Sequence, residues 1–68
     1  MIEYITENGW YQFHKCTCGG TLSVSFRNPN KGGAKLKIQP NRNRWIMSGA
    51  LSNKGVGLDT LKTYLESL

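Results

Sequence analysis

Acidic residues are scarce in this chain and are missing altogether from its middle. The 68 residues contain four aspartates and glutamates against nine lysines and arginines, which gives a formal net charge of +5. No acid stands between Asn8 and Leu58, so this stretch supplies no pair of carboxylates for general acid–base catalysis. We therefore expect a protein that is not an enzyme. The four carboxylates lie near the two ends, at Glu3, Glu7, Asp59 and Glu66.

Long apolar runs and an extensive set of cysteines are also missing. No run approaches the roughly 20 apolar residues of a transmembrane helix, and residues 1–9 lack the basic and apolar regions of a signal peptide. Two cysteines in such a chain favour a reducing compartment, with thiols or metal ligands in place of a disulfide framework. We expect a cytoplasmic protein, in the host cytoplasm or the virion if the gene is viral, with no membrane partner.

The size of the chain predicts a single small domain over residues 1–68. A domain of this length buries only roughly 60% of the surface of its unfolded chain, so its core is marginal. The hydrophobic fraction of 38%, which includes seven aromatic residues, indicates a folded chain and not a disordered basic tail.

Alternating apolar and polar residues in the middle of the chain predict an antiparallel sheet. Apolar side chains occupy every second position of Thr21–Arg27 and of Ala34–Gln39, which indicates two strands with one apolar and one polar face. The residues between them, 28–33, are turn formers and predict a loop. A further strand is indicated at Arg44–Ser48, after a second turn at 40–43.

The start of the chain predicts another hairpin. Ile2–Thr6 and Trp10–Cys16 are rich in β-branched and aromatic residues, and the Asn8-Gly9 pair between them is typical of a type I′ turn. The alternative is that residues 1–7 form a loose arm and the first strand begins at Trp10.

The end of the chain changes to a helical period. Leucines recur at three-to-four spacing after a glycine-rich stretch, 49–57, in which we expect little regular structure. A helix this short is marginal alone, so Leu61 and Leu65 should be buried against the sheet. The prediction is an α+β fold: an antiparallel sheet of four to five strands, a β-meander, with one C-terminal helix packed on its apolar face.

One histidine and both cysteines stand close together at alternate positions. Residues two apart on a strand lie roughly 6–7 Å from one another, too far for the histidine to activate a thiolate directly. The cysteines could be small buried residues, zinc ligands or redox-active groups. We expect no disulfide between them, because a two-residue separation strains disulfide geometry. The candidate metal ligands are His14, Cys16 and Cys18.

The basic residues of the middle predict a surface for an anionic partner. Cations on the polar face of a flat sheet can follow the phosphates of an extended single strand, and aromatic side chains can stack on its bases. Trp10, Tyr11, Phe13 and Trp45 are the candidate stacking residues, although we expect Phe13 and one tryptophan in the core. The candidate nucleic-acid-binding residues are Arg27, Lys31, Lys35, Lys37, Arg42, Arg44 and Trp45.

The second half of the chain carries a short motif, Lys54-Gly55-Val56-Gly57-Leu58-Asp59, ahead of the expected helix. With this motif, the segment from about Gly33 to the end of the chain resembles the single-stranded nucleic-acid-binding fold of the transcriptional positive cofactor four and its Whirly-type and bacterial relatives. The resemblance implies a curved antiparallel sheet followed by one helix, and a homodimer whose paired sheets grip the nucleic-acid backbone. It implies binding through Lys35, Lys37, Arg42, Arg44 and Trp45.

These observations favour a non-enzymatic module that binds nucleic acid, with single-stranded DNA or RNA preferred. One alternative is a structural or protein-interaction module, such as a small phage accessory protein, that docks on an acidic protein surface. A second alternative is a zinc-stabilised adaptor. No other cofactor is expected.

Overall fold

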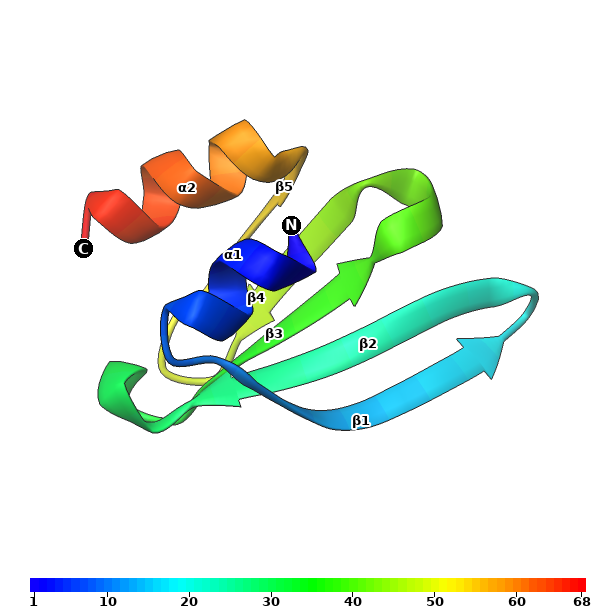
Figure 1. Ribbon diagram of the computed structural model, residues 1–68, viewed down its shortest axis with the longest axis horizontal. Coiled ribbons are helices and arrows are strands. Elements are labelled where there is room, and N and C mark those ends of the chain that lie inside the picture. Colours follow the sequence, from blue (N-terminus) through cyan, green and yellow to red (C-terminus); the bar gives the residue numbers. More distant parts are fainter.

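The computed structural model describes the backbone of residues 1–68 and every side chain except that of Cys18. Five strands and two α-helices follow one another along the chain, with a short 3₁₀ helix in each of two connections (Figure 1). In order they are α1 (Ile2–Glu7), β1 (Tyr11–Cys18), β2 (Thr21–Asn28), η1 (Pro29–Lys31), β3 (Ala34–Gln39), η2 (Pro40–Arg42), β4 (Arg44–Ser48), β5 (Asn53–Val56) and α2 (Leu58–Glu66).

The five strands form one antiparallel sheet in sequence order, β1-β2-β3-β4-β5. This is the predicted meander, and the α+β fold class is confirmed. The central hairpin is the most regular part, because its strict alternation places Val24 opposite Ile38 and Phe26 opposite Leu36 on one face. All four side chains are buried, so this face of the sheet forms the floor of the core.

Both helices lie on the same side of the sheet and cover its apolar face (Figure 1). Ile5 of α1 and Leu61 of α2 are fully buried, and Leu65 is 8% exposed. The predicted burial of the two leucines against the sheet is therefore confirmed. The buried core consists of Ile5, Trp10, Val24, Phe26, Ala34, Leu36, Ile38, Trp45, Met47, Leu61 and Leu65.

The N-terminal segment is a helix, so the predicted strand at Ile2–Thr6 and its hairpin are wrong. Met1, Tyr4 and Ile5 pack on the core, and this spacing of three and four is helical, not alternating. The helix ends at Asn8, whose side-chain Nδ2 donates to the Tyr4 carbonyl (2.6 Å) and whose backbone N–H donates to the Ile5 carbonyl (3.0 Å). The Asn8-Gly9 pair thus terminates a helix and does not turn a hairpin.

The fifth strand, β5, lies within the stretch for which little regular structure was expected. Its sequence, NKGV, contains poor strand formers, so pairing with β4 and not local propensity explains it. Gly55 is opposite Trp45, and a Cβ at Gly55 would lie 2.7 Å from Cζ2 of the indole. Because glycine has no side chain, the Trp45 ring can occupy this space.

Candidate functional site

The face of the sheet opposite the helices is open, and we call it the outer face. Residues paired across neighbouring strands share a face, so the register assigns every strand residue to one side or the other. Lys35 and Lys37 alternate with the buried residues of β3 and are exposed, which places them on the outer face. Their partners on β2, Arg27 and Ser25, therefore lie there too.

Two rows of side chains cross the outer face at right angles to the strands. In one row, His14 pairs with Ser25, Ser25 with Lys37, Lys37 with Ile46, and Ile46 with Lys54. In the next row, Tyr11 pairs with Arg27, Arg27 with Lys35, and Lys35 with Ser48. The cations of different strands thus form one continuous surface. The basic residues of the outer face are His14, Arg27, Lys35, Lys37, Arg44 and Lys54.

The acidic side chains are confined to the helical layer of the molecule. Glu3 and Glu7 lie in α1, and Asp59 and Glu66 lie in α2, so every carboxylate side chain of the chain is in a helix. The five strands contain none. The outer face is thus a positive surface with no carboxylate interspersed, whereas soluble domains usually mix both signs. Such a surface attracts anions and repels itself in their absence.

Two of the candidate cations lie in the 3₁₀ helices that connect strands, and not in the strands themselves. Lys31 is half-buried in η1, and Arg42 is exposed in η2. Both 3₁₀ helices begin at a proline and end at a residue with a left-handed backbone, Gly32 (φ 69°) and Asn43 (φ 52°). Lys31 and Arg42 are therefore in connections between strands and outside the rows of the basic surface.

Trp45 belongs to the core, contrary to the hypothesis that it stacks on bases at the surface. Its side chain is 1% exposed, and its ring stacks on Tyr64 of α2 with centroids 5.8 Å apart. Its Nε1–H donates to the Thr60 hydroxyl at 3.0 Å, which satisfies the polar atom of the buried indole. Trp10 is also buried, at 2% exposed.

The aromatic residues exposed on the outer face are Tyr11 (49%) and Phe13 (46%) of the edge strand β1. We expected Phe13 in the core, and that prediction is wrong. The β1–β2 register shifts between Gln12 and His14, so Phe13 is the extra residue of a bulge. The guanidinium carbon of Arg27 lies 5.1 Å from the centroid of the Phe13 ring, which is a cation–π contact and holds the ring on the outer side.

His14 and Cys16 lie on the outer face, because their partners Ser25 and Ser23 alternate with the buried residues of β2. Cys16 is disulfide-bonded, so the expectation of a thiol or a metal ligand in place of a disulfide is wrong at this residue. Its sulfur is therefore not in the thiolate form that binds zinc. Among the described side chains, no three histidines, cysteines or acids gather as metal ligands. The expected ligand Cys18 lies outside the described side chains, and the disulfide at Cys16 leaves the predicted zinc site without one of its thiolate ligands.

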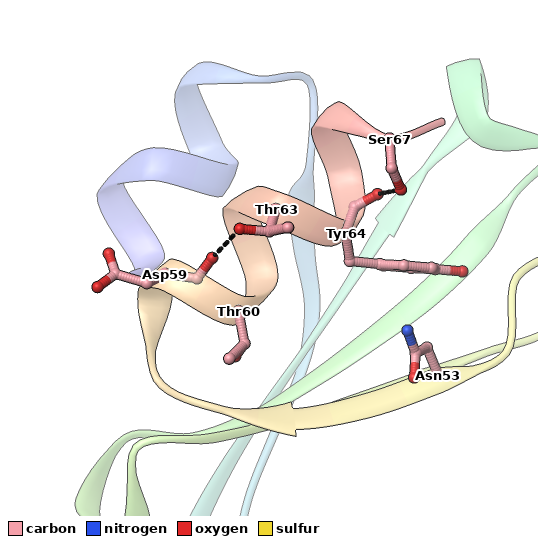
Figure 2. Close-up of a pocket in the computed structure, with 6 residues that line it drawn as sticks. All are labelled: Asn53, Asp59, Thr60, Thr63, Tyr64 and Ser67. Atoms are coloured by element: carbon pink, nitrogen blue, oxygen red, sulfur yellow. Dashed lines mark hydrogen bonds between the residues drawn. The ribbon is translucent and has the colours of Figure 1, made fainter.

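A shallow hollow of about 440 Å³ lies beside α2 and β5 (Figure 2). Two of its hydroxyl groups donate to backbone carbonyls: Thr63 to the Asp59 carbonyl (2.8 Å) and Ser67 to the Tyr64 carbonyl (2.6 Å). The Asp59 carboxylate points away from the Tyr64 ring. These two hydrogen bonds stabilise the helix.

A second hollow, of about 460 Å³, lies on the outer face over β4 and β5. It includes Lys54, a basic residue that the predicted binding set does not contain. The pairing of Ile46 with Lys54 adds this cation to the row that begins at His14. The lining residues are Arg44, Ile46, Lys54, Gly55 and Val56.

Comparison of the chain with protein families, with curated proteins and with solved structures found no match. The resemblance to the positive-cofactor-four fold therefore stays a prediction from sequence. Within the described residues, no helix has the length and apolar character required to cross a bilayer.

Proposed function

We propose that this protein binds single-stranded nucleic acid on the outer face of its sheet and catalyses no reaction. The observation that carries the proposal is that the carboxylate side chains are confined to the helices, whereas five of the nine lysines and arginines lie on the outer face of the sheet. A polyanion laid across the rows would neutralise several cations at once and release its own counterions, which is the main source of affinity for nucleic acids.

The exposed aromatic residues favour a single strand over a duplex. Tyr11 and Phe13 present about half of their surface to solvent at one end of the basic rows. Bases of a single strand have free faces that can stack on such rings, whereas the bases of a duplex are stacked on one another. Arg27 connects the exposed aromatic pair to the basic row, because it contacts the Phe13 ring and pairs with Lys35.

Replacing Lys35 and Lys37 together by glutamine should weaken binding in a salt-dependent way. Both side chains are exposed on β3, so the double variant should fold normally. Each phosphate contact to a single strand contributes about 0.7 to the slope of log K against log salt. We expect the slope for oligothymidine, measured by fluorescence anisotropy at several salt concentrations, to become less negative by about 1 to 1.5.

The matched control removes two charges from the opposite side of the molecule. Lys15 pairs with the core residue Val24, and Lys62 lies on α2 near Tyr4, so neither is on the outer face. Glutamine at both positions changes the net charge by the same amount. If this control lowers the slope as much as the Lys35/Lys37 variant, binding follows net charge and the proposed surface is refuted. An acidic protein partner would instead leave oligonucleotides unbound by the wild-type chain.

A further inference from the structure

The hollow over β4 and β5 combines two cations and two aliphatic side chains in a checkerboard. Arg44 pairs with Val56, and Ile46 pairs with Lys54, while each of these residues lies two positions from its neighbour on the same strand. The cations therefore occupy one diagonal and the aliphatic residues the other. Diagonal neighbours in an antiparallel pair are about 7–8 Å apart, so both cations can reach a group seated above the centre.

Val56 presents an exposed aliphatic side chain to this hollow. It is 59% exposed on the edge strand, although it is aliphatic and its β4 partner is an arginine. Ile46 beside it is half-buried and lines the same hollow. An apolar patch bordered on two corners by cations fits a ligand that has both a flat apolar surface and a negative charge.

We propose that this hollow holds one nucleotide of the bound strand, with its phosphate between Arg44 and Lys54 and its base against Ile46 and Val56. The inference rests on the proposed function and assigns a subsite to it. The volume of about 460 Å³ is within the range of small-ligand sites, about 300–1,000 Å³. The hollow lies at the β5 edge and the exposed aromatic pair at the β1 edge, so the strand would cross the sheet along the basic rows.

The test compares 12-nucleotide oligothymidine with an abasic chain of the same number of phosphates. Val56→Thr keeps the shape of the side chain but replaces a methyl group with a hydroxyl on an exposed position. We expect this variant to bind oligothymidine about fivefold more weakly at every salt concentration, and to bind the abasic chain as the wild type does. Leu68→Thr, which changes an exposed leucine beyond α2, is the control and should bind both ligands normally.

The phosphate contacts are tested with Arg44→Gln combined with Lys54→Gln. Two lost contacts should make the salt slope less negative by about 1.4 for both ligands, whereas Lys15→Gln should leave it unchanged. Near-ultraviolet circular dichroism of the buried tryptophans checks that each variant is folded. If the wild type binds oligothymidine and these variants bind with unchanged affinity and slope, the subsite is refuted while the proposed function stands. If the wild type binds neither ligand at low salt, both proposals fail.

Discussion

Replacing Trp45 by alanine should destabilise the protein by about 3–5 kcal/mol, the cost of removing a large aromatic side chain from a core. Trp45 is 1% exposed, stacks on Tyr64 and donates to Thr60, so one substitution removes contacts that join β4 to α2. A domain of this length has a free energy of unfolding of roughly 3–10 kcal/mol. We therefore expect the variant to be largely unfolded at 37 °C, as measured by urea denaturation followed by circular dichroism.

Trp45→Phe is the matched variant. It keeps an aromatic ring in the core but loses the hydrogen bond to Thr60, so it should cost clearly less than the alanine substitution. A Trp45→Ala protein as stable as the wild type, with affinity for single-stranded DNA lowered at every salt concentration, would contradict this placement. That outcome would return Trp45 to the role of a base-stacking residue.

Leu61→Ala should lower the free energy of unfolding by about 2–4 kcal/mol. Leu61 is fully buried where α2 docks on the sheet, and the short helix depends on this docking because an isolated helix of its length is marginal. Urea denaturation measures the loss. Leu68→Ala is the control, since Leu68 is 54% exposed and its truncation should change stability by less than about 0.5 kcal/mol. Equal effects of the two substitutions would show that α2 does not dock through Leu61.

The parts of the fold that the sequence predicts are those in which one period is unambiguous. Alternation in residues 21–39 defines the central hairpin and its polar face, and the leucine spacing defines α2. At the N-terminus the alternation of Ile2, Tyr4 and Thr6 competes with the spacing of Met1, Tyr4 and Ile5. The second set packs on the core, which stabilises the helix. These contacts are tertiary, so the local sequence alone does not predict them.

The exposure of the aromatic residues depends on register, which the sequence does not specify. In β4, Trp45 and Ile46 are both apolar and point to opposite faces, so either could have been the buried one. Pairing with Ile38 turns Trp45 inward. In β1, a bulge between Gln12 and His14 places Phe13 outward. The sequence indicates β5 more weakly still. Glycine is a poor strand former, and Gly55 is suited to this strand only because the Trp45 ring lies opposite it.

The most direct test of the central claim is a titration of the wild-type protein with single-stranded oligothymidine and with a duplex, at 50 and 200 mM salt. With four to six phosphates neutralised, the log–log slope should be roughly −3 to −4, so affinity for the single strand should fall by about 60- to 250-fold between these concentrations. The duplex should bind more weakly at both. Absence of binding at 50 mM salt, or tight binding that does not change with salt, would contradict the assignment of the outer face as a nucleic-acid-binding surface.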